Sequence, residues 1–148
     1  MNITRLLALL LVASIICPSA FSQEKKPRLA LACEMTSDFE IHENGASRRE
    51  TKTSVDTWII DLTQKTASNG AGFETDADIS DEFIKFAWKR EMKVVGGKSS
   101  IDAQVTISRI TGRIQERRAS RTETDFMRKE LKIITSTGDG VCTESKKF

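Results

Sequence analysis

The chain has 148 residues, a formal net charge of +2, one histidine and no tyrosine. The nearly balanced charge gives no global reason to expect a nucleic acid or an anionic membrane as partner, and we expect neither. Because His42 is the single histidine, a histidine-based metal site or a serine–histidine catalytic site would have to use it.

Residues 1–22 predict a secretory signal peptide. Met1–Arg5 is short and positively charged, Leu6–Cys17 is apolar, and Ala20-Phe21-Ser22 has small residues where a cleavage site needs them. The apolar run is too short to span a bilayer comfortably, and no second long hydrophobic stretch follows. We therefore expect a single β domain, residues 23–148, that is periplasmic or secreted and has no membrane span.

Two cysteines remain after the signal peptide, Cys33 near the start of the domain and Cys142 near its end. An even pair in an oxidising compartment predicts a disulfide. Reactive or metal-binding thiols are the weaker alternative, because neither a Cys-x-x-Cys spacing nor a histidine cluster accompanies them.

The domain begins with a long strand. Apolar and polar residues alternate over Leu29–His42, which is typical of a strand with one buried face. Asn44-Gly45 predicts a two-residue hairpin turn, which sets Leu31 opposite Trp58. The returning strand is expected over Val55–Leu62.

The next segment carries weaker strand patterns. Thr66–Glu74 predicts a loop or a short edge strand, and Asp76–Glu82 predicts a solvated acidic loop. Its alternating carboxylates resemble a calcium loop, but the central glycine is missing and Ala87 stands where a bidentate glutamate is needed. We expect no metal and no cofactor.

A hairpin over Phe83–Ile110 is the strongest pattern in the chain. Both halves alternate apolar and polar residues, and Gly96-Gly97 suits a turn in which both central residues need positive φ. The predicted register pairs Val95 with Lys98, Trp88 with Val105 and Phe86 with Ile107. The sequence Gly96-Gly97-Lys98-Ser99 also resembles the end of a phosphate-binding loop, but the first glycine of that motif and its helix are missing.

The last third is more ambiguous. Arg113–Arg121 is polar on both faces beyond Ile114 and predicts an edge strand or a protruding ribbon. Residues 122–135 fit a strand or a helix, and the β-branched pair Ile133-Ile134 favours the strand. Thr135–Gly140 predicts a turn, and Val141–Thr143 a last short strand.

These elements predict an all-β fold, an antiparallel meander of about seven or eight strands that forms a small barrel, with a β-sandwich as the alternative. The Cys33–Cys142 disulfide would close the first strand onto the last.

No catalytic constellation is recognisable, and His42 is expected on the surface. Trp58, Phe86 and Trp88 lie at apolar positions, so we expect core packing, with ligand contact as the alternative. The turn Gly96-Gly97-Lys98 is a candidate interaction loop.

Four stretches of the chain resemble a loose group of small exported proteobacterial β proteins of uncharacterised function. They are Leu29-Ala-Leu-Ala-Cys33, Trp58-Ile-Ile-Asp61, Val105-Thr-Ile-Ser-Arg109-Ile-Thr-Gly112 and Gly140-Val-Cys142. The resemblance implies no catalytic residues. Periplasmic lysozyme inhibitors are similar in size, export and terminal cysteines, and the nearest counterpart of their inhibitory loop is Gly96–Ser100.

The expected function is therefore that of an exported, non-enzymatic β domain that binds an envelope protein or a small apolar ligand. The alternative is an inhibitor of an envelope hydrolase such as lysozyme, which would act through an exposed loop.

Overall fold

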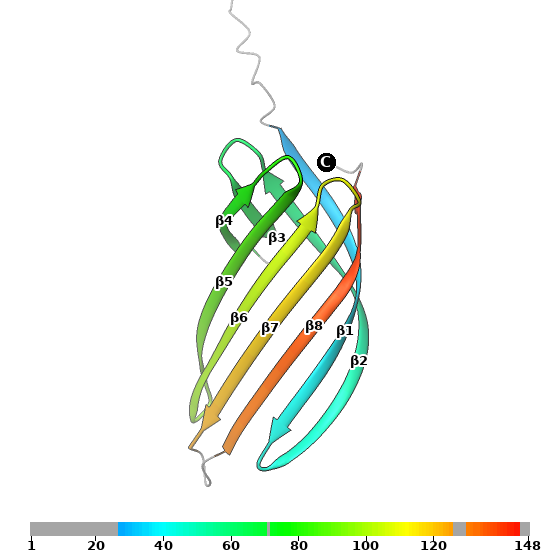
Figure 1. Ribbon diagram of the computed structural model, residues 1–148. Coiled ribbons are helices and arrows are strands. Elements are labelled where there is room, and N and C mark those ends of the chain that lie inside the picture. Colours follow the sequence, from blue (N-terminus) through cyan, green and yellow to red (C-terminus); the bar gives the residue numbers. More distant parts are fainter. Residues whose placement is uncertain (1–26, 71, 126–129, 146–148) are drawn as a thin grey trace, which may run out of the picture.

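The computed structural model describes residues 27–70, 72–125 and 130–145. These residues form eight strands: β1 (Arg28–Glu43), β2 (Ala46–Asp61), β3 (Thr66–Asn69), β4 (Glu74–Ile79), β5 (Phe83–Val94), β6 (Gly97–Ser108), β7 (Arg113–Thr124) and β8 (Glu130–Glu144). Each strand pairs antiparallel with its neighbours in sequence, and β8 also pairs with β1, so the sheet closes into a barrel (Figure 1). The predicted barrel is confirmed, and the sandwich alternative is wrong.

The predicted signal peptide, residues 1–22, lies outside the described residues. No helix in the described part of the chain is long and apolar enough to cross a membrane.

The first hairpin has the predicted register. Asn44 and Gly45 both have positive φ, 51° and 85°, as the two central residues of this turn type require. Leu31 lies opposite Trp58, as the two-residue turn predicts. The returning strand is longer than predicted, because β2 starts directly after the turn at Ala46.

The β5–β6 hairpin differs from the predicted register by two residues. Val94 pairs with Gly97, so Trp88 lies opposite Ala103 and Phe86 opposite Val105. The turn is centred on Val95-Gly96, and Gly96 alone supplies the positive φ, 71°. A shift of two residues keeps every side chain on its face, so the predicted alternation is still correct.

The acidic segment after β3 is partly a strand, which corrects the predicted loop. Ala77 is buried and Ile79 packs against the core, while Asp76 and Asp78 on the same strand face outward. The strand was not predicted because its many carboxylates made the alternation of Ala77 and Ile79 with polar residues difficult to recognise in the sequence. Thr66–Asn69, left open between loop and edge strand, forms β3 between β2 and β4.

Two predictions about the last third are wrong. The polar Arg113–Arg121 is not an edge or a ribbon, because β7 pairs along its length with β6 and β8. The predicted turn Thr135–Gly140 lies inside the 15-residue strand β8, and the predicted short strand Val141–Thr143 is its end. Gly140 belongs in this strand because a Cβ there would collide with the backbone of Glu34 and Met35. Of residues 122–135, Glu130–Ile134 is strand, as favoured, and 126–129 lie outside the described residues.

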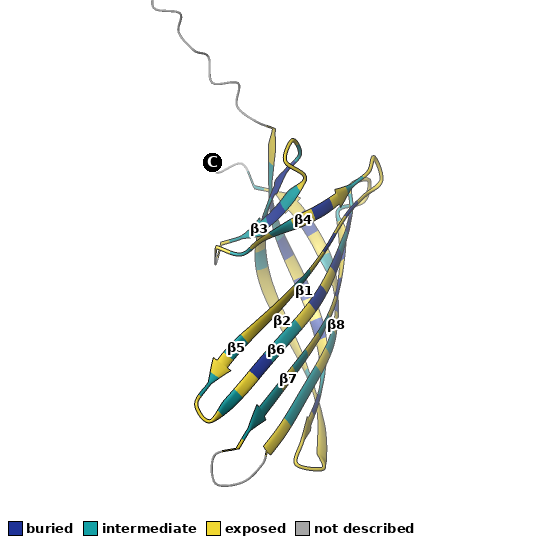
Figure 2. Ribbon diagram, turned by 90° about the vertical axis from the view of Figure 1, so that its left-hand side faces the viewer, coloured by how far each residue is buried: buried dark blue, intermediate teal, exposed yellow. Residues whose placement is uncertain are grey.

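The core fills the end of the barrel that holds β3 and β4 (Figure 2). The predicted disulfide is present: Cys33 and Cys142 are directly opposed on β1 and β8 and their sulfurs are bonded. The buried apolar side chains of this core, besides the two cysteines, come from β1 to β7. They include Leu31, Met35, Trp58, Ile60, Ile84, Phe86 and Ile114.

Candidate functional site

The barrel is closed at one end and open on one side at the other. The strand β2 pairs with β3 from Trp58 to Asp61, and β4 pairs with β5 from Ile84 to Phe86. Below these pairs, within the described residues, Ala46–Thr57 has β1 as its single neighbour and Ala87–Val94 has β6. Figure 2 shows β3 and β4 confined to one end while the other strands continue below them.

The β3–β4 hairpin stops early because its turn is held by Asn69. The Asn69 side-chain oxygen accepts a hydrogen bond from Phe73 N–H at 3.2 Å, and the Asn69 carbonyl accepts one from Gly72 N–H at 3.1 Å. Phe73 then packs its ring against Trp88, with 5.0 Å between centroids. Thr75 Oγ1 donates to the Ala87 carbonyl at 2.9 Å, which occupies the first acceptor on the exposed part of β5.

The inner surface of the open half forms a trough. We define the trough by two rows of directly paired, inward-facing residues that cross six strands. The upper row is Trp88, Ala103, Arg118, Ser136, Phe39 and Glu50. The lower row is Arg90, Ile101, Ser120, Ile134, Ile41 and Arg48. In the upper row, the small Ala103 and Ser136 flank Arg118, and the aromatic Trp88 and Phe39 lie outside them. The surface therefore combines apolar and charged side chains.

One wall of the trough centres on Trp88. The Arg118 guanidinium lies 5.8 Å from the Trp88 ring centroid and donates to Glu116 Oε1 from Nε at 3.0 Å and from Nη2 at 2.6 Å. Glu116 is 6% exposed, so this pair neutralises a carboxylate that faces the barrel interior. The Trp88 Nε1–H is buried and has no hydrogen-bond acceptor within the described residues. An unpaired buried donor is unfavourable, and an acceptor that reached it after a small side-chain movement would relieve this cost.

The opposite wall is formed by β1 and β2. The Lys52 ammonium lies 5.7 Å from the Phe39 ring centroid and 2.9 Å from a Glu50 oxygen, and Arg48 is 3.4 Å from the other oxygen. The hydrogen bond and charge of Lys52 lower the pKa of the Glu50 carboxyl below its ordinary value. A hollow of about 350 Å³ borders this wall, and Phe39, Glu50 and Ser136 line it from the inner face. Its other lining residues, which include Asp38, Thr51 and Thr137, lie at outward-facing positions of the same strands.

The structure separates the three aromatic residues that the sequence grouped. Trp58 and Phe86 are core residues, 3% and 5% exposed, with ring centroids 4.7 Å apart. Trp88 lies at the inner end of the trough. The Trp58 Nε1–H also has no acceptor within the described residues.

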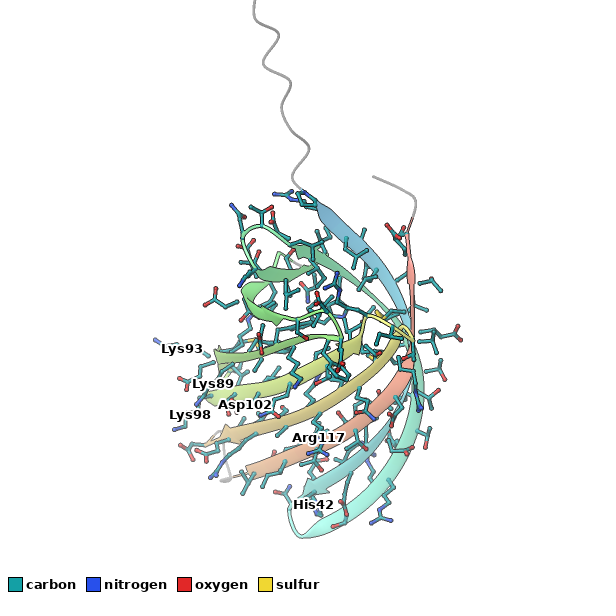
Figure 3. The ribbon with its side chains drawn as sticks, turned by 45° about the horizontal axis from the view of Figure 1, so that its top comes forward. His42, Lys89, Lys93, Lys98, Asp102 and Arg117 are labelled. Carbon is teal, nitrogen blue, oxygen red and sulfur yellow. A yellow bond between two sulfur atoms is a disulfide. The ribbon has the colours of Figure 1, made fainter. Side chains whose placement is uncertain are left out.

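The candidate interaction loop lies at the open end. Val95 and Gly96 form the turn, Gly97 begins β6, and the exposed Lys98 is 3.9 Å from Glu123. Lys93 lies directly opposite Lys98, and Lys89 opposite Asp102. Figure 3 shows the lysines projecting from the ends of β5 and β6.

The single histidine has a serine neighbour that sequence reasoning missed, although the hairpin register pairs His42 with Ser47. The His42 Nδ1 is 2.7 Å from Ser47 Oγ, and its Nε2 is 3.7 Å from Glu40. The three side chains lie on the outer face beside the β1–β2 turn, and His42 and Ser47 are exposed to solvent (Figure 3). Catalytic interactions are strongest in dry, preorganised surroundings, and the solvent-exposed His42 and Ser47 lack such surroundings.

Sequence reasoning also missed Phe39, Arg118 and Glu116 as site residues. A signal was available, because Glu116 and Arg118 follow the buried Ile114 at alternate positions and therefore had to face inward if β7 was not an edge. Within the described residues, no three metal-ligating side chains form a cluster.

No protein-family model matches the chain, and no curated protein sequence matches it significantly.

Proposed function

We propose that this chain is an exported, non-enzymatic binding protein that holds a small ligand with an apolar part in the trough. The observation that carries the proposal is the buried, unpaired Nε1–H of Trp88 at the inner end of an amphipathic concave surface. Because ligand sites combine apolar walls with a few fixed polar groups, this donor and its surroundings fit such a site.

The trough favours an amphipathic ligand. Phe39 and Trp88 offer apolar flanks, and Trp88 Nε1–H offers one donor for a carbonyl or carboxylate oxygen. Arg90 faces the same surface one position below Trp88, is exposed, and has no ion-pair partner within the described residues. An anionic or carbonyl head group beside an apolar body matches this set.

Fluorescence provides a direct test, because the chain has two tryptophans. In a Trp58→Phe background, Trp88 reports on the trough alone, and anilinonaphthalene sulfonate serves as an amphipathic anionic probe. Adding Trp88→Phe keeps a ring and removes the donor, so probe affinity should fall about five- to tenfold, the effect of one hydrogen bond. Val141→Ala, on the outer face, is the matched control.

Equal probe affinity with and without Trp88→Phe, read from probe emission, would contradict the trough as the site. Mass spectrometry of material released from the purified protein by organic solvent tests for a natural ligand. A bound amphipathic compound in wild type that is depleted in the Trp88→Phe, Arg90→Ala variant would support the proposal.

A second candidate function is inhibition of an envelope hydrolase such as lysozyme through the β5–β6 turn. The observation that favours it is Val95, an apolar side chain 86% exposed at the tip of this hairpin. Exposed apolar residues at loop tips are suited to insertion into a partner's cleft. Inhibition of lysozyme by the wild type, lost in Val95→Asp, would support this function, and no inhibition at micromolar concentration would remove it.

A further inference from the structure

The exposed edge of β2 carries a row of unpaired backbone groups. The Leu62 N–H donates to the Pro27 carbonyl at 3.1 Å, which places the even-numbered residues of β2 in the ladder with β1. The odd-numbered residues therefore direct their N–H and C=O groups to the other side, where Ser68 Oγ already donates to the Ile59 carbonyl at 3.4 Å. Below β3 these groups belong to Ser47, Arg49, Thr51, Thr53, Val55 and Thr57.

This free edge is the longer of the two that border the opening. On β5, the free part covers Ala87–Val94, and Thr75 occupies the Ala87 carbonyl. On β2, it covers Ala46–Thr57, and both faces of that segment are polar apart from Val55, which is 68% exposed. A long free edge can be completed by an added antiparallel strand, whose own edge must match it in charge.

The charges of the β2 edge are complementary to themselves. If the strand pairs antiparallel with an identical strand about Thr51, Glu50 lies opposite Lys52 of the other copy, and the reverse pair is formed by symmetry. Arg48 then lies opposite Ser54, with Asp56 and Lys52 of the other copy as its two diagonal neighbours. No like charges are directly opposed in this register.

The neighbouring registers with the same face alternation are worse. A shift centred on Lys52 opposes two lysines, and a shift centred on Glu50 opposes two glutamates and sets Arg48 against Lys52. Directly opposed like charges destabilise a sheet, whereas opposite charges stabilise it. Charge complementarity therefore selects the register about Thr51.

We infer that the open side of this barrel is an interface for a second copy of the chain, formed by antiparallel pairing of the two β2 edges about Thr51. In that register Ser47 pairs with Val55, Arg49 with Thr53, and Thr51 with its counterpart, so five of the six free residues of the edge form backbone hydrogen bonds. The second copy adds a strand beside Glu50 and Lys52, and so supplies a wall that each trough lacks. This inference does not depend on which ligand the trough holds.

The first test removes one edge hydrogen bond. Sedimentation of the wild-type domain at micromolar concentration should give a dimer. Val55→Pro deletes an edge N–H and leaves the ladder with β1 intact, so it should give a monomer, while Val55→Thr keeps the amide and should remain a dimer. A cooperative thermal unfolding transition shows that the Val55→Pro domain is folded, and its midpoint should be independent of protein concentration, as for a monomer.

The second test uses charge exchange, which is specific for the register. Glu50→Lys and Lys52→Glu should each raise the dimer dissociation constant at least about tenfold, because each opposes like charges twice. The double variant Glu50→Lys, Lys52→Glu should restore the dimer. An equimolar mixture of the two single variants should form a heterodimer, because both opposed pairs are again attractive.

Three results would overturn the inference: a monomeric wild type, a dimer that Val55→Pro leaves intact, or single charge variants that dimerise like the wild type. A photo-crosslinking amino acid at position 53 should yield a product of twice the chain mass. A product with a different protein instead would assign the edge to that protein and exclude a second copy. Binding of the fluorescent probe to the trough is measured in a separate experiment. A negative result there would contradict the proposed ligand site, whereas a monomeric wild type would contradict the proposed interface.

Discussion

At position 116, a glutamate occupies a place in the barrel where the neighbouring strands contribute valine and glycine. Its ladder partners are Val105 on β6 and Gly138 on β8, and its charge is balanced by Arg118 two residues along the same strand. The pair separates the apolar end of the barrel from the polar trough. The Arg118 guanidinium also faces the Trp88 ring, so Arg118 contributes to the shape of the trough.

Removing the arginine should therefore destabilise the domain. Arg118→Met leaves the buried Glu116 carboxylate without its two hydrogen bonds, and we expect the free energy of unfolding to fall by about 1–2 kcal/mol. This is less than for a fully buried pair, because the Arg118 side chain is 39% exposed and water screens the interaction. Urea unfolding measures the change, and Glu116→Gln combined with Arg118→Met should recover part of it. A single variant as stable as wild type would show that the pair is dispensable.

A second residue-scale prediction concerns pH. Asp61 is 4% exposed and accepts hydrogen bonds from the backbone N–H of Gln64 at 2.8 Å and Thr63 at 3.0 Å, and from Arg28 at 3.1 Å. These bonds, that of Gln64 first, lower the pKa of the Asp61 carboxyl below the ordinary 3.8. The stabilisation is therefore complete above that pH and is lost as the pH falls toward the lower folded-state pKa.

Asp61→Asn should accordingly be less stable than wild type near neutral pH, and the difference should shrink below pH 3.8. Urea unfolding of both proteins across this range measures it. Asp78→Asn, on the outer face of β4, is the control and should change stability little at any pH. A difference for Asp61→Asn that stays constant down to strongly acidic pH would contradict the assignment.

At the scale of single elements, the two adjacent glycines of the β5–β6 hairpin have different tasks. Gly96 supplies the positive φ of the turn, whereas Gly97 is a strand residue that β7 approaches closely. The sequence suggests one turn for both, and this is why the predicted register is shifted by two residues. Alternation specifies which face a residue occupies, but it does not distinguish registers that differ by two.

Gly97→Ala should therefore destabilise the hairpin through packing. A Cβ at Gly97 would collide with the Glu123 carbonyl and lie 2.8 Å from Thr124 Cα. We expect a loss of about 1–3 kcal/mol, typical of overpacking. Gly70→Ala is the matched control, because nothing lies within 4 Å of its added Cβ. Equal thermal unfolding midpoints for the two variants would contradict the packing role of Gly97.

The strands β4, β7 and β8 show where sequence reasoning fails for elements. In β4, charged residues at outward positions obscure the alternation of apolar and polar residues. In β7, charged residues lie at both outward and inward positions, so the sequence shows almost no alternation. In β8, Gly138 and Gly140 suggest a turn, but they are small because Ser37 and the backbone of β1 lie against them. The reason in each case is contact with a neighbouring strand, which the local sequence does not reveal.

At the scale of the whole molecule, the disulfide and the β1–β8 ladder together close the sheet. The sequence predicts that the first and last strands are neighbours, because each carries one of the two cysteines, but it left a barrel and a sandwich both open. The β1–β8 ladder decides for the barrel. The open side was not predictable. It depends on where the β3–β4 hairpin ends, which is set by the Asn69 turn and by the packing of Phe73 on Trp88.

Breaking the disulfide should lower stability substantially. Cys33 and Cys142 are 109 residues apart, and closing a loop of this size contributes up to about 4.7 kcal/mol in the chain-entropy model. Reductant should lower the thermal unfolding midpoint of wild type and leave that of a Cys33→Ala, Cys142→Ala variant unchanged. Thiol labelling verifies that reduction has occurred, and an unaltered midpoint in fully reduced wild type would contradict the role of the bond.

The pairing of β1 with β8 also has a consequence for the order of folding. Every other ladder joins strands adjacent in sequence, so those contacts have low contact order and form early. The first strand, in contrast, finds its second neighbour in β8, about 100 residues further along the chain, and this long-range closure costs more chain entropy. A growing chain can assemble its hairpins one after another, yet Cys33 and Cys142 meet only after β8 has been made. Closure of the barrel thus requires the whole of β8.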